Sequence, residues 1–289
     1  MEIRYREART EDMPACVDLF IESVSDLLRR HNMPVDTPQP ERTLAFYQHS
    51  LSTGVFHVAE AEGKLAALAC ALVRDHLWFL AGFWARPGFQ KQHVGMNVLR
   101  RVWNAGKEAR ATHFFVWSSF DLPAMAAYMK LGMLPGTQIL VFEGAPKPEP
   151  RGAMDYKAEP LKKAFAMAMD ETTLGVRREV DHEYFARQGW QGRQVLRDGH
   201  AVGYYYLEGG SIGPAAWTAD EHAEAVLGLA CREASDLGAE IRLRVPGMNH
   251  AGLRFAFDTG LRLRGFAHLL MTAPFGHLER YLPSGPSVF

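Results

Sequence analysis

The chain of 289 residues has a formal net charge of -1, with 47% hydrophobic and 22% charged residues. A length of this order predicts two domains of ordinary globular composition. The balanced charge gives no electrostatic footprint for nucleic acid, so no nucleic-acid partner is expected. The charged N-terminal stretch lacks the apolar core of a signal peptide, and no apolar run is long enough to span a bilayer, so no membrane partner is expected.

Cysteine and histidine usage limits the chemistry further. Cys16, Cys70 and Cys231 lie far apart in apolar stretches, which predicts buried reduced thiols and a cytoplasmic location. The 12 histidines are scattered, and none is paired with a cysteine or carboxylate at ligand spacing, so no metal site is expected. A monomer and a homodimer are both compatible with these features.

The first half alternates between strand-like and helical patterns. Thr10 is the expected N-cap of the first helix, because acidic residues follow it in the first turn. The predicted order is a strand at 3–8, a helix at 10–28, a Pro-rich loop, a helix at 41–51, a hairpin of 56–60 and 65–73, a strand at 77–85, a helix from 94, a strand at 111–117, a helix from 121 and a closing strand at 139–143.

The stretch at residues 77–105 is the most informative part of the first half, because it predicts a strand, a tight loop and a helix in succession. Its apolar and aromatic strand is ended by a proline and a glycine, and apolar residues recur at helical spacing from Val94 onward. The first amides of such a helix, together with its dipole, form an anion site suited to a pyrophosphate. Lys91 and His93 add possible positive charge in the loop before it.

This loop carries a family resemblance. The segment Gln90-Lys91-Gln92-His93-Val94-Gly95 resembles the acyl-CoA loop of the GNAT superfamily of N-acetyltransferases, Gln/Arg-x-x-Gly-x-Gly/Ala. The final glycine is present as Gly95, and His93 replaces the first. An ordinary strand-to-helix connection is the alternative for this segment taken alone. His93 is either a solvated loop residue, a phosphate contact or the mark of a decayed site.

A second motif follows in the order that the family requires. Asp121, Ala124 and Tyr128 resemble the GNAT pattern Asn-x-x-Ala-x-x-x-Tyr, with Asp121 replacing the asparagine and able, as an N-cap, to accept from free amides. The resemblance implies an α/β (α+β) fold in which a mixed, largely antiparallel sheet is flanked by helices. It assigns residues 1–145 to a GNAT acetyltransferase domain.

The resemblance also implies a cofactor and a set of residues. Acetyl-CoA is the expected acyl donor, bound near the splayed ends of the strands at 77–85 and 111–117, and an amine is the expected acceptor. The implied acetyl-CoA contacts are Phe83, Trp84, Ala85, Gln90, Lys91, Gln92, His93, Val94, Gly95, Met96, Asp121 and Ala124.

The same resemblance gives Tyr128 the role of the acid that protonates the departing thiolate, because a phenol of pKa about 10 suits a leaving thiol of similar basicity. The alternative is a helix residue whose ring packs and whose hydroxyl is hydrated. No general base is assigned: a water chain could serve, and none of the candidate side chains is favoured. These candidates are Asp75, His76, Glu60, His57 and His113.

The second half repeats the order of the first. A Pro-rich linker is assigned to 146–160, and a degenerate GNAT-like domain to 161–289. The predicted elements are helices at 160–170 and 181–188, strands at 193–196 and 203–207, a helix at 219–237, a strand at 241–245, a helix from 249 and a strand at 266–271. The acyl-CoA pattern is missing, Pro214 removes an amide that could bind phosphate, and Ala256 stands where the tyrosine would.

These features predict a tandem protein with one active half. The predicted function is an acetyl-CoA-dependent N-acetyltransferase that acts on a primary amine of a small molecule or protein. The second half is expected to support the first. The alternative is a non-catalytic acyl-CoA-binding or sensing protein with a decayed GNAT site.

Overall fold

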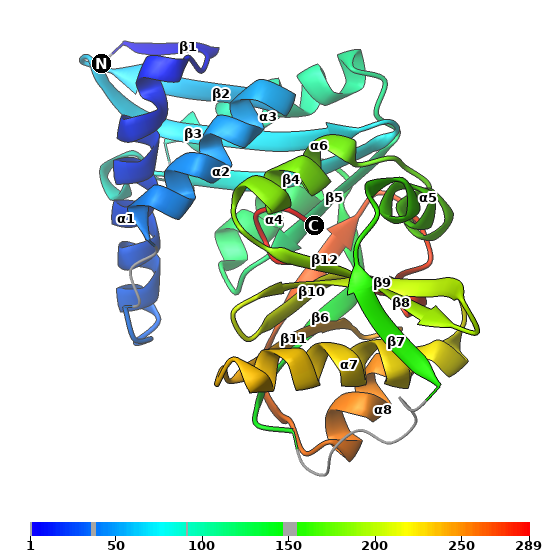
Figure 1. Cartoon of the computed structure of the whole chain (residues 1–289). Coiled ribbons are helices and arrows are strands. Elements are labelled where there is room, and N and C mark those ends of the chain that lie inside the picture. The colour runs from blue at the N-terminus through cyan, green and yellow to red at the C-terminus, as the bar shows by residue number, and fades with distance from the viewer. Residues whose placement is uncertain (1, 36–38, 91, 147–154) are drawn as a thin grey trace. The chain divides into compact units, whose positions relative to one another are not determined.

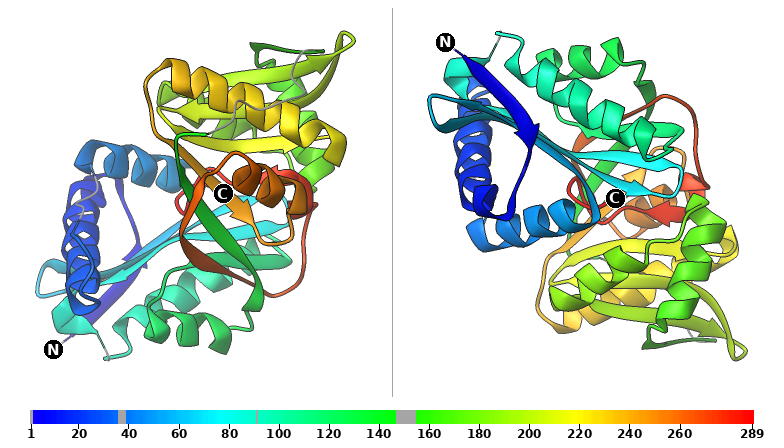
Figure 2. Two further views of the ribbon diagram at one scale, coloured as in Figure 1. Left: turned by 90° about the horizontal axis from the view of Figure 1, so that it is seen from below. Right: turned by 90° about the horizontal axis from the view of Figure 1, so that it is seen from above.

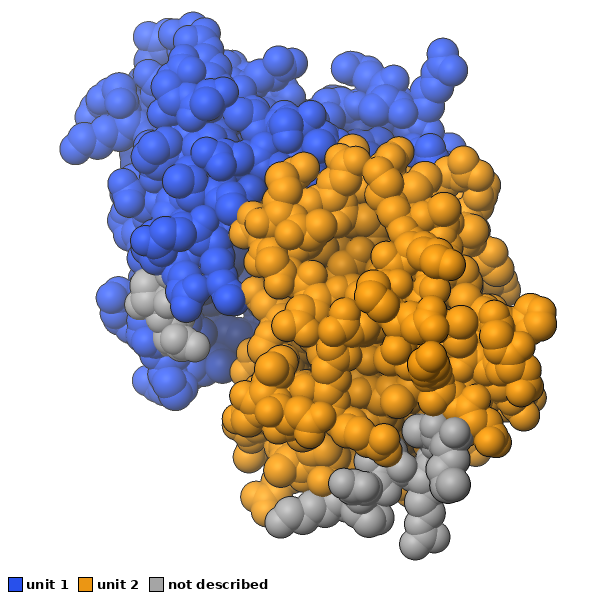
Figure 3. Space-filling model, viewed as in Figure 1, with its two compact units in different colours: residues 1–133 blue, residues 134–289 orange. Residues whose placement is uncertain are grey.

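The computed structural model describes residues 2–35, 39–90, 92–146 and 155–289, and the chain divides into two compact units. Unit 1 is Met1–Met133 and unit 2 is Leu134–Phe289 (Figure 3). Each unit combines helices with a largely antiparallel sheet, which confirms the predicted α/β (α+β) fold class. No helix in the described parts of the chain combines the length and the apolar composition that crossing a bilayer requires.

Unit 1 contains five neighbouring strands, with helices on both faces of the sheet that they form (Figures 1 and 2). Strands β1 to β4 pair antiparallel in chain order, and β4 pairs parallel with β5. Helices α1 and α2 cover one face, and α3 covers the other. The elements are β1 (Ile3–Glu7), α1 (Met13–Arg30), α2 (Pro40–Thr53), β2 (Gly54–Ala61), β3 (Lys64–Arg74), β4 (Leu77–Ala85), α3 (Val94–Glu108), β5 (His113–Ser118) and α4 (Leu122–Lys130).

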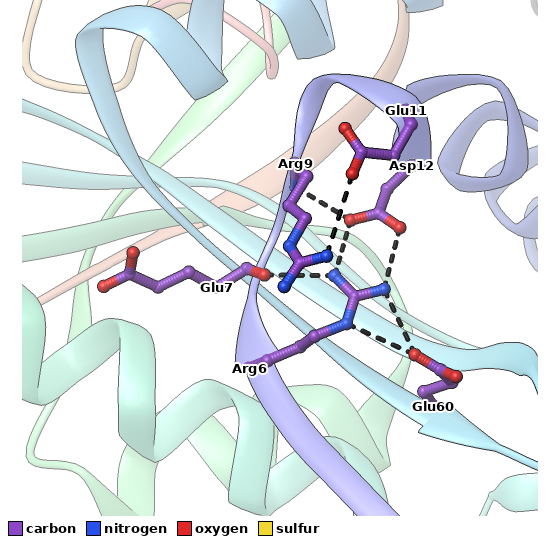
Figure 4. Close-up of polar contacts among 6 residues, drawn as sticks. All are labelled: Arg6, Glu7, Arg9, Glu11, Asp12 and Glu60. Carbon is purple, nitrogen blue, oxygen red and sulfur yellow. Dashed lines mark hydrogen bonds and ion pairs between the residues drawn. The ribbon is translucent and has the colours of Figure 1, made fainter.

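The first helix starts later than its sequence predicted. A 3-10 turn, Thr10–Asp12, precedes α1, so Asp12 and not Thr10 stands at its N-cap. Asp12 is held by other bonds: its carboxylate accepts from both terminal nitrogens of Arg6, at 2.6 and 2.8 Å, and from the Arg9 amide at 2.7 Å (Figure 4). Arg6 also donates to Glu60 on β2, at 3.2 Å. This ion cluster ties β1 to β2 and to the start of α1.

We expect Asp12→Asn to destabilise unit 1 by about 2 kcal/mol, because it removes the charged acceptor of a mostly buried guanidinium. The Arg6 hydrogen bonds lower the pKa of Asp12, so its contribution is complete above the ordinary Asp pKa and is lost as pH falls through the lowered value. Urea unfolding at pH 7 and at pH 3 should show a smaller difference between wild type and variant at pH 3.

Glu11→Gln is the matched control for this cluster. Glu11 is exposed, and its carboxylate pairs with Arg9 at 3.8 Å (Figure 4). An exposed pair of this kind contributes about 0–1 kcal/mol. If both variants lost the same small amount, the cluster would not stabilise the unit.

The strands of unit 2 follow one another in the order β12-β6-β11-β10-β9-β8-β7, with β13 paired to β10. Helix α7 packs on β9, β10 and β11 over a core that includes Phe142, Trp217 and Phe255. The elements are β6 (Leu134–Gly144), β7 (Tyr156–Pro160), α5 (Lys163–Leu174), α6 (Glu179–Arg187), β8 (Gln191–Arg197), β9 (His200–Glu208), β10 (Ser211–Trp217), α7 (Ala223–Asp236), β11 (Ile241–Pro246), α8 (His250–Asp258), β12 (Arg262–Met271) and β13 (Tyr281–Leu282).

Strand β6 has partners that the sequence pattern does not indicate. It contains the strand predicted at 139–143 as the closing strand of the first domain, yet it pairs antiparallel with both β11 and β12. The units therefore divide at Met133, whereas the sequence analysis placed a boundary at residue 145. The end of the predicted linker, Tyr156–Pro160, forms strand β7 on β8.

Candidate active site

The parallel strands of unit 1 diverge at their carboxyl ends. They pair from Leu77 with His113 up to Leu80 with Val116, and β4 then continues to Ala85. The register between β3 and β4 shifts at this point, because Gly82 faces Cys70 and Leu80 faces Ala71. One extra residue in β4, a β-bulge, bends the strand where its pairing with β5 ends. The predicted splay is therefore present, and the bulge gives it a local cause.

The residue that breaks the glycine pattern adopts the backbone conformation that glycine favours. His93 is the N-cap of α3 and has φ of 62°, in the left-handed region. Its carbonyl accepts from Asn97 at 3.0 Å, so the helix starts normally. The first amides of a helix have no acceptor within it, so those of Val94, Gly95 and Met96 point out of the N-terminus. The exposed His93 side chain leaves this backbone geometry intact.

The two loop glutamines brace the loop internally. The Gln90 side-chain amide donates to the Ala85 carbonyl at 3.3 Å, and that of Gln92 donates to the Gly88 carbonyl at 2.9 Å. Ser23 of α1, which the sequence analysis did not single out, also donates to the Ala85 carbonyl, at 3.2 Å. This carbonyl at the end of β4 is therefore engaged within the protein. Lys91 lies outside the described residues.

Three of the predicted segments meet at Phe83. A Cβ on Gly95, in the first turn of α3, would lie 3.2 Å from the Phe83 ring, so only glycine fits without a shift. The Tyr128 ring of α4 also packs edge-on against the Phe83 ring, with centroids 5.9 Å apart. Trp84 points to the opposite face, where its ring contacts Phe20 of α1 at 5.0 Å. The end of β4, the start of α3 and α4 thus form one cluster.

Tyr128 is buried, with 6% of its surface exposed. Burial, and secondly the nearby charge of Asp121, raise the pKa of this phenol well above its ordinary value. Both causes disfavour the phenolate, so Tyr128 remains a protonated hydroxyl at neutral pH. The hydroxyl is thus held in the form that carries a proton, and it is a weaker acid than an ordinary tyrosine of pKa about 10.

Asp121 occupies the predicted position without the predicted bond. It is the N-cap of α4, but its side chain accepts no capping hydrogen bond, and its buried Oδ1 has no hydrogen-bond partner among the described residues. The expectation that its carboxylate binds the helix amides is therefore wrong for this structure. Ala124 lies in the first turn of the same helix.

The five candidate bases lie away from the strand ends. Asp75, His76 and His113 lie at the opposite, amino ends of β4 and β5. The length of these strands, at roughly 3.3 Å per residue, separates them from the carboxyl ends. Glu60 belongs to the ion cluster with Arg6. His57 is on β2, beyond β3, and burial lowers its pKa so that it is neutral near pH 7. The structure brings none of them to the cluster around Phe83.

In unit 2 the corresponding position is filled by the chain itself. Strands β10 and β11 pair in parallel at Ser211 and Ile212, and beyond these residues β13 pairs with β10, with Leu282 opposite Ala215. Tyr281 and Leu282 are fully buried, and β13 also contacts β11. Strand β13 thus occupies the place where a ligand would lie between diverging strands.

Of the two features that predicted a degenerate second half, the structure supports the one at Ala256 and contradicts the one at Pro214. Asn249 caps α8 by accepting from the Gly252 amide at 2.8 Å, and the fully buried Ala256 stands seven residues on, as expected. Pro214, however, lies inside β10 and not in the turn before α7, so it removes no phosphate-binding amide. Nowhere in the described residues do three or more His, Cys, Asp or Glu side chains gather as metal ligands.

We expect His93→Gly to stabilise the protein by about 0.5–1 kcal/mol, because a left-handed residue with a Cβ is strained relative to glycine. It should bind acetyl-CoA as well as wild type or more tightly, because the helix amides lose a neighbouring side chain. Thermal unfolding and titration calorimetry measure the two effects. His93→Ala is the control, since it removes the imidazole and keeps the strain. A tenfold weaker affinity in both variants would make the imidazole a ligand contact.

Comparison with known proteins identifies a family model that matches part of the chain. Residues 21–133 match the model of the acetyltransferase (GNAT) family. No curated protein matches the chain significantly.

Solved structures match both units. A candidate acetyltransferase from Pyrococcus horikoshii has a TM-score of 0.79 at 17% identity, over 99% of this chain and 96% of that chain. A GCN5-related N-acetyltransferase from Sphaerobacter thermophilus has a TM-score of 0.62 at 17% identity, over 96% and 98%. A tandem GNAT protein from the clavulanic acid biosynthesis pathway has a TM-score of 0.60 at 12% identity, over 94% and 99%.

The solved structures show that the fold is shared along the whole chain, whereas the family match covers only residues 21–133. The two motifs that carried the resemblance, at Gln90–Gly95 and at Asp121–Tyr128, both lie within the matched residues. The chain therefore carries a GNAT-family acetyltransferase domain at residues 21–133, within a fold shared along its length with GNAT acetyltransferases.

Proposed function

We propose that unit 1 binds acetyl-CoA and transfers its acetyl group to a primary amine of a small molecule or protein. The observation that carries this proposal is the convergence at Phe83. There the glycine of the helix N-terminus and the buried Tyr128 meet the end of the bulged strand β4. An anion site, a strand edge and a proton donor are thus assembled within one unit.

Each part has a distinct task. The outward amides of Val94, Gly95 and Met96, with the dipole of α3, suit the pyrophosphate of CoA. The backbone of Phe83 and Trp84, beyond the pairing with β5, suits the amides of the pantetheine arm. Acetyl-CoA supplies the activated thioester, and the Tyr128 hydroxyl supplies a proton to the sulfur that leaves.

Unit 2 is proposed to bind no acyl-CoA and to support unit 1. Its β13 lies between β10 and β11, and Ala256 offers no hydroxyl. We therefore expect one acetyl-CoA per chain. The three cysteines are buried and unpaired, which fits a reducing compartment, and we place the protein in the cytoplasm on this ground.

Titration calorimetry with acetyl-CoA and a thiol-release assay with a panel of amines test the proposal. Binding should occur once per chain, and at a hundredfold excess over Kd it should stabilise the folded state by about 2.7 kcal/mol. Gly95→Val should weaken binding at least about tenfold, since its side chain meets Phe83. Gly88→Val is the matched control, because a Cβ at Gly88 meets nothing within 4 Å.

The outcomes separate the candidate functions. Binding together with thiol release that depends on an amine supports the transferase. Binding without turnover on any amine would leave an acyl-CoA-binding or sensing protein, the alternative that the missing base favours. Unchanged melting and no heat of binding at millimolar acetyl-CoA would remove both.

A further inference from the structure

The exposed apolar side chains of unit 1 are confined to two short segments. Among its described residues, the large hydrophobic side chains that are exposed are Met33, Val35, Phe120, Leu122 and Met129. The first two lie in the connection after α1, and the others lie between the end of β5 and the end of α4. Exposed apolar residues gathered in this way commonly mark a binding surface.

The two segments meet above the strand ends. His31, the C-cap of α1, packs its ring edge-on against Phe120, with centroids 4.7 Å apart. Earlier in α1, Ser23 bonds to the carbonyl at the end of β4. Phe120 follows the end of β5 by two residues and precedes Asp121, the N-cap of the helix that carries Tyr128. The segments thus flank both strands at the edge where they diverge. We call Met33, Val35, Phe120 and Leu122 the apolar rim.

The charged groups near the apolar rim carry both signs, with a small excess of cations. The last turn of α1 carries Arg29 and Arg30, and α4 ends with Lys130. Of the acidic groups nearby, Asp26 pairs with Arg30 at 2.9 Å and Glu22 pairs with Arg86. Asp121, between Phe120 and Leu122 in the chain, has a buried Oδ1 with no hydrogen-bond partner among the described residues. A polycationic ligand would meet the like charges of Arg29 and Lys130, whereas an apolar group would bury surface against the rim.

We propose that the apolar rim receives the side group of the acceptor, and that the acceptor is a primary amine bearing an aromatic or branched aliphatic group. This inference rests on the proposed transfer function and adds the class of substrate. The amine would approach along the rim toward the diverging ends of β4 and β5, and the apolar group would remain among the four side chains of the rim.

The test compares amines of nearly equal basicity. At saturating acetyl-CoA, kcat/KM for 4-phenylbutylamine should exceed that for butylamine at least about tenfold, the discrimination expected of an apolar site, and should exceed that for spermidine by more. Phe120→Ala and Leu122→Ala should each bring the ratio of the two monoamines toward one. Leu237→Ala, at an exposed leucine of unit 2, should leave the ratio at its wild-type value.

Binding of 4-phenylbutylamine to the CoA-loaded protein, measured by calorimetry, gives a readout that needs no turnover. Binding that Phe120→Ala weakens at least about tenfold supports the rim even if no amine is acetylated, in which case only the transfer function fails. Equal kcat/KM for the monoamines, a preference for spermidine, or ratios unchanged in both rim variants would overturn the inference. So would self-association that Leu122→Asp abolishes, because a second copy of the chain would then cover the rim.

Discussion

Tyr128→Phe should lower kcat by about 10² to 10⁴, the usual range for loss of a general acid, while the Kd for acetyl-CoA stays within a few-fold. Even a tenfold loss corresponds to a barrier change of about 1.4 kcal/mol. The substitution removes one hydroxyl and keeps the ring that packs against Phe83 at 5.9 Å, so the cluster should persist. Steady-state kinetics with the best amine measures kcat, and calorimetry measures Kd.

The pH dependence gives this prediction a second readout. Because burial and Asp121 raise the pKa of Tyr128, its acid form persists above the ordinary tyrosine range, and kcat should show no alkaline loss from this group below about pH 10. Asp121→Asn removes the second cause, so any alkaline limb should move to lower pH.

Tyr47→Phe is the matched control for the hydroxyl deletion. Tyr47 is a buried tyrosine of α2, on the opposite sheet face, and its loss of a hydroxyl should leave kcat within about twofold. A fall in affinity with kcat preserved in Tyr128→Phe would make Tyr128 a binding residue. If neither kcat nor Kd changed in Tyr128→Phe, the phenol would have only a packing role, and water would protonate the thiolate.

Local patterns predicted most of the first unit. The strand that ends at Ala85 and the helix from Val94 were placed by apolar periodicity and by the proline and glycine between them, which are local signals. The helix that carries Tyr128 was placed by the resemblance of Asp121–Tyr128 to a family motif. The bulge in β4 has no comparable signal, because it is defined by a register with Cys70 and Ala71 on another strand. The left-handed conformation of His93 was also not predicted, because glycine is the residue that normally indicates this conformation.

Non-local pairing explains what was missed in unit 2. Strand β10 was not predicted because Gly213-Pro214 within it has the composition of a turn. Strand β13 has two residues, too few for any alternation. The strand at 139–143 was recognised as a strand, but its partners β11 and β12 lie more than 95 residues further along the chain. A period-2 pattern indicates a buried face and does not specify the neighbouring strand.

Phe142→Ala should lower the stability of unit 2 by about 3–5 kcal/mol, the cost of a large cavity in a packed core. Phe142 is fully buried on β6, opposite Leu243 of β11 and Leu263 of β12, and its ring packs edge-on against Phe257 at 5.2 Å. Unit 1 should be unaffected, because none of these partners belongs to it. Hydrogen exchange followed by mass spectrometry should show faster exchange in β11 and β12, with α3 and β4 unchanged.

Leu134→Ala provides the control on the same strand. Leu134 is 57% exposed at the start of β6, so its truncation should cost no more than about 0.5 kcal/mol. In the folded Phe142→Ala protein, acetyl-CoA should still bind with the wild-type Kd, since the amides of α3 and the end of β4 are intact. Faster exchange confined to α3 and β4, or a loss of acetyl-CoA binding by the folded variant, would assign β6 to the first domain, as its sequence position suggests. Faster exchange confined to unit 2 would establish that a strand encoded directly after the Asp121–Tyr128 motif stabilises the other half of the protein.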